Sequence, residues 1–215
     1  MKIAFLGDSI TFGYALADKA KRYSTLVCEE LGAEEENHGI TGTLVAKAGQ
    51  NRKDDKSFVS RAHLIDDGDV AVVFGGTNDY FWSDTAITGE DDSFFEHALE
   101  SIIARIKEKR AGKITLFVTP YSHSGEGNFL GGEHWQCANR HDTTATNYNG
   151  YTLLDYVNLI EKVCEKHGVP CLNLHKNFPF DWRVHTTDGC HPNEAGHTLI
   201  AQAVSAKLKE LLAKN

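Results

Sequence analysis

No apolar run in this chain is long enough to cross a membrane. Hydrophobic residues make up 41% of the 215 residues, but they never form the roughly 18 consecutive positions that a spanning helix needs. The N-terminal apolar run, residues 3–6, is too short for the hydrophobic region of a signal peptide and leads directly into Gly7-Asp8-Ser9. We therefore expect a cytoplasmic protein without a membrane partner.

Cysteine is scarce and scattered. The five cysteines form no C-x-x-C pair, which excludes a zinc ribbon and a dithiol redox motif. His134 and Cys137 have the spacing of half a zinc site, but the sequence offers no second ligand pair, so we predict no metal. In a cytoplasmic protein the cysteines are expected to be free thiols.

The chain also lacks a basic segment and a linker. Its 22 Lys and Arg residues face 30 Asp and Glu residues, for a formal net charge of −8, without a lysine-rich stripe. Nucleic acids and anionic lipids attract clustered positive charge, so neither is an expected partner. With four prolines and no Pro- or Ser-rich stretch, residues 1–215 are predicted to form a single domain.

Short strand-like segments alternate with helical patterns. The predicted strands are four apolar runs, 2–6, 70–74, 114–119 and 171–174, and a weaker segment at 34–37. Apolar spacing of three and four residues predicts helices over 94–106, 153–163 and 192–211. The first helix follows N-cap candidates at 91–93, and Pro192 opens the last one. This alternation predicts a parallel α/β sheet.

Two connections, 79–90 and 121–148, carry no periodic pattern. Both leave the predicted carboxyl ends of strands, where open α/β sheets bind ligands, and long loops usually serve function. We therefore expect substrate-binding side chains in them. The aromatic candidates are Trp82, Tyr121, Trp135 and Tyr148.

A serine, a histidine and an aspartate could together perform nucleophilic chemistry. Ser9 follows the first strand, but serine is a weak nucleophile until a base takes its proton. Asp188 and His191 have D-x-x-H spacing, which lets the aspartate bond one imidazole nitrogen while the other serves a serine. Taken alone, Ser9 is better explained as a turn or helix cap, whereas coincidence among 11 histidines explains the Asp–His pair only as well as a functional role does.

Two further segments could supply donors to an oxyanion. Asn78 follows the third strand, and its amide N–H is a good donor to charge that develops in a dry cleft. Gly42, with Gly39 as the second choice, allows a backbone N–H to approach a ligand closely. A turn is the alternative explanation for each segment, and Asp8 and Asp79, which neighbour the site residues, are expected to make local turn bonds. Combined with the serine, histidine and aspartate, however, they complete the set that acyl transfer requires.

The motifs and their order resemble the SGNH hydrolase family, also called GDSL-type lipases and esterases. The family's first block is similar to residues 7–13 (GDSITFG), its second to 37–42, its third to 76–79 and its fifth to 188–192 (DGCHP). Ile10 stands in place of the leucine of the name motif. Cys190 stands where an aliphatic residue is usual, and we predict a packing role for it rather than a second nucleophile.

The resemblance implies a flavodoxin-like three-layer α/β/α sandwich with a five-stranded parallel sheet. It also implies a serine esterase that needs no cofactor, with Ser9 as nucleophile, His191 as base and Asp188 as the partner of His191. The oxyanion donors would be the Ser9 and Gly42 N–H groups and the Asn78 side chain. Ser9 would form an acyl-enzyme that water hydrolyses, and activity would fall at acid pH as His191 protonates.

The catalytic blocks do not select a substrate. The connection 121–148 is rich in aromatic and amide side chains, which suit stacking on a sugar ring, and it lacks an aliphatic row. We therefore expect a small-molecule ester with a short acyl chain, such as an O-acetylated carbohydrate. Lysophospholipase, thioesterase, arylesterase and acyltransferase activities stay open, as does a non-catalytic binding module.

Overall fold

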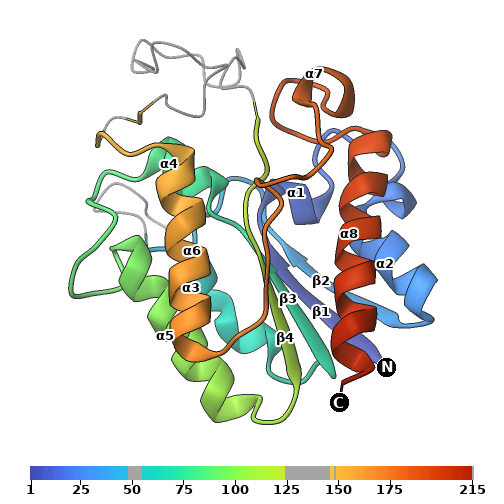
Figure 1. Cartoon of the computed structure of the whole chain (residues 1–215), viewed down its shortest axis with the longest axis horizontal. Coiled ribbons are helices and arrows are strands. Elements are labelled where there is room, and N and C mark those ends of the chain that lie inside the picture. Colours follow the sequence, from blue (N-terminus) through green and yellow to red (C-terminus); the bar gives the residue numbers. More distant parts are fainter. Residues whose placement is uncertain (48–54, 124–145, 148, 215) are drawn as a thin grey trace.

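Five parallel strands form the centre of the fold, in the order β2-β1-β3-β4-β5 (Figure 1). They are β1 (Lys2–Gly7), β2 (Glu34–Gly39), β3 (Val70–Phe74), β4 (Ile114–Val118) and β5 (Cys171–Leu172). The computed structural model describes residues 1–47, 55–123, 146–147 and 149–214. The prediction of a five-stranded parallel α/β sheet is confirmed, and its strand order is that of flavodoxin-like folds.

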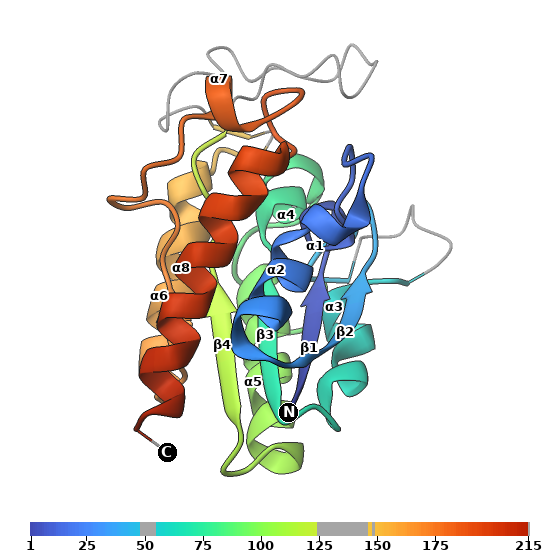
Figure 2. The same ribbon diagram turned by 90° about the vertical axis from the view of Figure 1, so that its right-hand side faces the viewer.

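Helices cover both faces of the sheet (Figures 1 and 2). One face packs against α2 (Tyr23–Leu31) and α8 (Glu194–Leu212), and the other against α3 (Phe58–Arg61), α5 (Phe95–Lys109) and α6 (Leu153–His167). The short 3₁₀ helices are η1 (Lys19–Lys21) and η2 (Ala62–Ile65). Because both faces are covered, strand β3 is buried along its whole length, which explains its continuous apolar run.

The two cores divide the side chains of each central strand between them. In β3, Val72 and Phe74 pack with α2 and α8, whereas Ala71 and Val73 pack with α5 and α6. This division follows from the strand period of two, since successive side chains point to opposite faces of the sheet. The edge strand β2 is only half-buried, which explains its polar sequence and its weak signal.

Local hydrogen bonds set several element ends differently from the sequence prediction. Strand β5 stops at Leu172 because the Asn173 side chain accepts hydrogen bonds from the backbone N–H groups of His175 and Lys176 and starts a turn. Helix α8 begins at Glu194 with Asn193 as N-cap, so Pro192 precedes the helix instead of opening it. Helix α5 has no side-chain N-cap, although 91–93 was predicted to supply one.

The connection predicted to be irregular at 79–90 is partly helical. Helix α4 (Thr77–Trp82) starts directly after β3, and its first turn contains Asn78 and Asp79. A helix of six residues has too few apolar positions to show a helical period. Most of the second connection lies outside the described residues.

Three short helices, α1 (Ser9–Phe12), α4 and α7 (Trp182–His185), lie at the carboxyl edge of the sheet (Figures 1 and 2). The chain goes from β1 to β2 on one side and then crosses back to β3 on the other side of β1. Segments that follow β1 and β3 therefore flank the switch point, where this class of sheet binds ligands.

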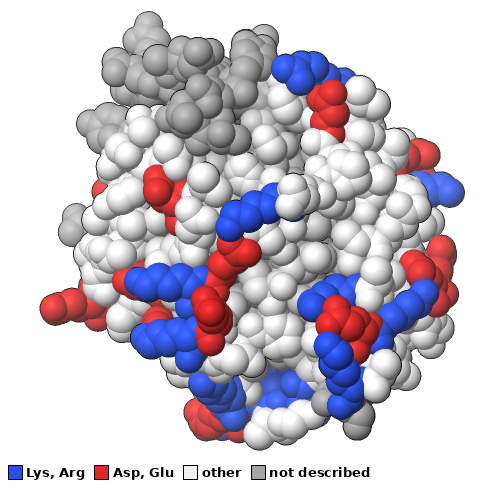
Figure 3. Space-filling model, in the orientation of Figure 1, with Lys and Arg blue, Asp and Glu red and all other residues white. Residues whose placement is uncertain are grey.

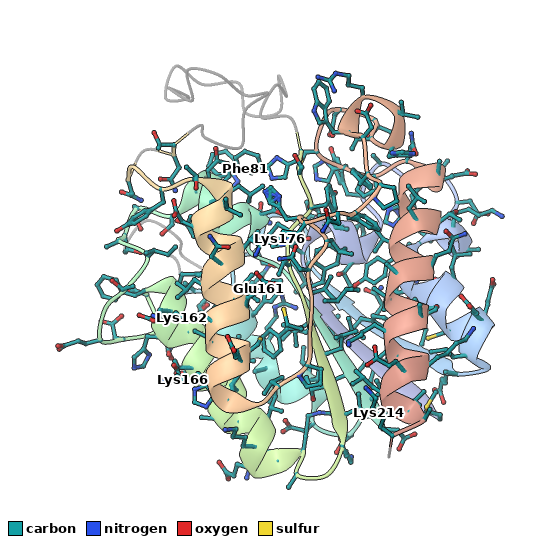
Figure 4. The ribbon with its side chains drawn as sticks, viewed as in Figure 1. Phe81, Glu161, Lys162, Lys166, Lys176 and Lys214 are labelled. Atoms are coloured by element: carbon teal, nitrogen blue, oxygen red, sulfur yellow. The ribbon has the colours of Figure 1, made fainter. Side chains whose placement is uncertain are left out.

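Charges of both signs are interleaved on the face shown in Figure 3. Along α6, Lys162 pairs with Glu96 and Lys166 with Glu100, and Figure 4 shows both lysines on that helix. No helix in the described part of the chain is long and apolar enough to span a membrane.

Candidate active site

Ser9 occupies a tight turn between β1 and α1. Asp8 caps the helix by accepting a hydrogen bond from the Ile10 backbone N–H at 2.9 Å. A Cβ atom at Gly7 would lie 1.9 Å from the Thr11 hydroxyl, so the turn closes this tightly only with glycine at that position. The result is a serine at the carboxyl edge of the sheet with 5% of its surface exposed.

His191 connects Ser9 to Asp188. Its Nε2 atom lies 3.0 Å from the Ser9 Oγ atom, and its Nδ1 atom lies 2.7 Å from Asp188 Oδ2. The second carboxylate oxygen, Oδ1, accepts the backbone N–H groups of Cys190 and His191 at 3.0 and 2.7 Å. Burial opposes ionisation of Asp188, but these hydrogen bonds from His191 outweigh it and lower its pKa. The carboxylate is therefore ionised and fixes the orientation of the imidazole.

Packing also holds the loop that carries His191. The Tyr121 hydroxyl donates a hydrogen bond to the Cys190 carbonyl at 2.6 Å, and Tyr121 is buried between Phe74 and Phe180. Tyr121, predicted to bind substrate, thus has a buried ring and a hydroxyl that holds the histidine loop. Cys190 is buried too, and burial raises its thiol pKa far above the usual value, as expected for a packing residue.

A chain of contacts joins the remaining candidates to Ser9. The Asn78 side-chain amide donates to the Thr43 carbonyl at 3.0 Å and to Asp8 Oδ2 at 3.3 Å. Thr43 follows Gly42, and Asp8 precedes Ser9, so Asn78 lies between the two predicted backbone donors. Gly42 has a φ of +74°, a conformation that favours glycine. To serve an oxyanion, Asn78 would give up its longer hydrogen bond, the one to Asp8.

Arg61 is the principal site residue that the sequence analysis missed. It is buried and donates to the Gly7 and His38 carbonyls at 3.2 and 2.6 Å and to the Thr43 hydroxyl at 3.1 Å. These bonds tie the end of β1, the end of β2 and the Gly42 loop together. The signal was an arginine inside the mainly apolar segment 58–65 (FVSRAHLI), where a surface charge is out of place.

Asp79 anchors the same loop from the other side. Its carboxylate accepts the backbone N–H groups of Val45 and Ala46 at 2.9 and 3.0 Å. Burial raises the pKa of Asp79 to about 7, although these donors act in the opposite direction. Burial likewise raises the pKa of Asp8 to about 6. Asp79 thus makes long-range bonds, where a local turn bond was expected.

The other predicted residues lie in three places. Gly39 donates its N–H to Asn37 and closely approaches the α1 backbone, so it is not an oxyanion donor. Trp82 is half-buried at the end of α4, beside Phe81, which Figure 4 places near the upper end of α6. Trp135, Tyr148 and the H-x-x-C pair lie outside the described residues. Among the residues that are described, no group of three His, Cys, Asp or Glu side chains could hold a metal.

The described geometry forms a hydrogen-bonded chain from a hydroxyl through an imidazole to a carboxylate. Such a chain can remove the hydroxyl proton as the oxygen attacks a carbonyl group and can return it to a leaving group. Beside it, the Asn78 amide and the backbone N–H of Gly42 can donate hydrogen bonds to a negatively charged oxygen. This arrangement is suited to acyl transfer.

Comparison with known proteins identifies relatives of the whole chain. The sequence model of the GDSL-like lipase/acylhydrolase family matches residues 5–199. A solved protein from Lactobacillus plantarum is 25% identical, with 97% of this chain and 96% of that chain covered and a TM-score of 0.79. A structure described as a possible lipase from Chitinophaga pinensis is 18% identical, with 98% of each chain covered and a TM-score of 0.70. The acetyl xylan esterase AlAXEase is 23% identical, with 96% and 99% covered and a TM-score of 0.64. No curated protein matches the chain.

Proposed function

The chain belongs to the GDSL-like lipase/acylhydrolase family and is a hydrolase that acts on ester bonds, and we propose that Ser9 is its nucleophile. The observation that carries this proposal is the placement of His191, whose two ring nitrogens lie 3.0 Å from Ser9 Oγ and 2.7 Å from Asp188 Oδ2.

In the proposed reaction, His191 Nε2 takes the Ser9 proton as Oγ attacks the ester carbonyl carbon. Asp188 holds Nδ1–H and stabilises the imidazolium that forms. The carbonyl oxygen becomes an oxyanion, which the Asn78 amide and the Gly42 and Ser9 N–H groups stabilise. The C–O bond to the alcohol then breaks, and the alcohol leaves with the proton from His191. Water repeats the sequence on the acyl-serine and releases the acid.

We propose further that the acyl group is short. Only 5% of Ser9 and 2% of His191 are exposed, and this burial favours a small acyl group at the nucleophile. An O-acetylated carbohydrate fits this proposal, because acetate is the smallest common acyl group of biological esters. The structural likeness to an acetyl xylan esterase supports the same substrate class, although at 23% identity it shows a shared fold only.

The test compares p-nitrophenyl acetate, butyrate and octanoate as substrates of the wild type and Ser9→Ala, followed by acetate release from acetylated xylo-oligosaccharides. We expect Ser9→Ala to lose activity towards all esters while remaining folded, and the wild type to prefer acetate. The matched control is Ser93→Ala, on the turn before α5. Activity that survives in Ser9→Ala would refute the nucleophile, and a preference for octanoate would refute the short acyl group.

A further inference from the structure

Tyr14 covers one side of His191. The two ring centroids are 4.5 Å apart and the rings are tilted by 52°, so the tyrosine ring is in contact with the imidazole. Despite this contact, 40% of Tyr14 is exposed. A large aromatic ring that touches a buried histidine and also reaches solvent lies at the mouth of the candidate site.

The backbone holds Tyr14 rigidly in this position. The Tyr14 N–H donates to the Ser9 carbonyl at 2.8 Å, and Gly13 before it has a φ of +77°. Ala15 after it has a φ of +66°, which costs free energy in a residue with a side chain. Lys19 closes the turn through hydrogen bonds to the carbonyl groups of Gly13 and Leu16. The strained turn is thus fixed on both sides of the tyrosine.

Three of the four exposed large hydrophobic side chains in the described part of the chain lie at the carboxyl edge of the sheet, and Met1 lies at its other end. Among the described residues, the large hydrophobic side chains that are exposed are Met1, Phe12, Tyr14 and Val184. Phe12 lies in α1 and Val184 in α7, and both helices lie at the carboxyl edge of the sheet (Figures 1 and 2). Asn193, two residues after His191, donates to the Val184 carbonyl at 2.8 Å and joins α7 to the histidine loop. Phe12, Tyr14 and Val184 therefore form an apolar rim on the histidine side of the site.

The chemistry specifies which part of an ester lies on that side. His191 returns its proton to the departing alcohol oxygen, so this oxygen must come within hydrogen-bonding distance of Nε2. The carbonyl oxygen turns the other way, towards Asn78 and Gly42. The alcohol portion consequently extends past the imidazole, over the surface that Tyr14 provides.

We infer that Tyr14 forms the wall of the alcohol subsite and that the alcohol it selects carries a ring, either a sugar or an aryl group. Both ring types offer a flat apolar face that stacks on an aromatic side chain. This inference rests on the proposed function, because it assigns a direction to a reaction at Ser9 and His191. It makes Tyr14 a specificity-determining residue for the leaving group.

The experiment keeps the acetyl group constant and varies the alcohol. Phenyl acetate and an acetylated methyl xylopyranoside supply the two kinds of ring, and ethyl acetate supplies none. For Tyr14→Ala we expect kcat/KM to fall about 10-fold on ring esters, equivalent to about 1.4 kcal/mol, mainly through KM. Ethyl acetate should change by less than about twofold. Tyr14→Phe keeps the ring and should restore wild-type values. If only one ring ester loses activity, that ester identifies the kind of alcohol.

Phe12→Ala is the comparison that separates Tyr14 from the rest of the apolar rim, because Phe12 is 42% exposed and lies in the same segment but has its ring against Lys19. We expect a smaller loss in Phe12→Ala than in Tyr14→Ala. An equal loss in Phe12→Ala would overturn the assignment to Tyr14. A loss of kcat on all three esters, including ethyl acetate, would show that Tyr14 only orients His191. Failure of the proposed function is distinguishable, since it would appear as activity that survives in Ser9→Ala.

Discussion

Replacing Asp188 with asparagine tests the proposed role of the carboxylate while keeping its shape. Two backbone N–H groups, from Cys190 and His191, point at Oδ1. The new amide must therefore place its carbonyl oxygen there and its NH₂ group at the position of Oδ2, 2.7 Å from His191 Nδ1. Two donors cannot face each other, so Nδ1 must become the acceptor and the ring hydrogen must move to Nε2.

This tautomer points its hydrogen at Ser9 Oγ and cannot accept the serine proton. We expect kcat on p-nitrophenyl acetate to fall about 10⁴-fold at neutral pH, the loss that the wrong tautomer causes in serine hydrolases generally. That factor corresponds to about 5.5 kcal/mol of transition-state stabilisation. Since both backbone hydrogen bonds survive, the melting temperature should shift by only a few degrees, of the order expected for about 1 kcal/mol.

The matched control is Asp181→Asn, an exposed aspartate that caps α7 by accepting the Arg183 N–H at 3.0 Å. It should keep kcat within about twofold of the wild type, as surface substitutions usually do. A folded Asp188→Asn protein that loses less than about 10-fold in kcat would refute the reasoning, because the tautomer argument requires a far larger effect.

Three further predictions concern Asn78, Asp79 and Gly39. Asn78→Ala should lower kcat about 10²–10³-fold with little change in KM, measured against Asn149→Ala as the control; a loss confined to KM would contradict a role in the transition state. Asp79 keeps its proton in the folded protein up to a pKa of about 7, whereas the unfolded chain releases it near pH 4, so folding stability is lost as the pH rises through this window. Relative to Asp79→Asn, which does not titrate, the wild type should lose up to about 4 kcal/mol of unfolding free energy from about pH 4 to about pH 8 in urea titrations; parallel pH profiles would contradict the raised pKa. Gly39→Ala places a Cβ atom 2.3 Å from the Phe12 backbone nitrogen and should destabilise the fold by about 1–3 kcal/mol in the same assay, whereas an unchanged urea midpoint would contradict the close approach.

The structural role of Asp79 shows where local patterns stop being informative. Its position after Asn78 suggested a local turn bond. Its carboxylate instead accepts backbone N–H groups that lie 33 and 34 residues earlier in the chain. Tyr121 is a similar case, because its hydroxyl donates to a carbonyl group 69 residues away. Backbone donors and acceptors are present at nearly every residue, so the sequence does not reveal which of them a side chain will meet.

The sequence by itself determined the sheet, the main helices and the family. Strand and helix periods are local properties of consecutive residues, and the motif blocks at 7–13, 76–79 and 188–192 are contiguous in the chain. Only the tertiary structure decided that Arg61 and Asp79 hold the Gly42 loop, that Tyr121 bonds to the loop that carries His191, and that Tyr14 covers His191. These contacts arise when the carboxyl ends of separate strands meet at one edge, and burial then gives each polar group its partner and its pKa.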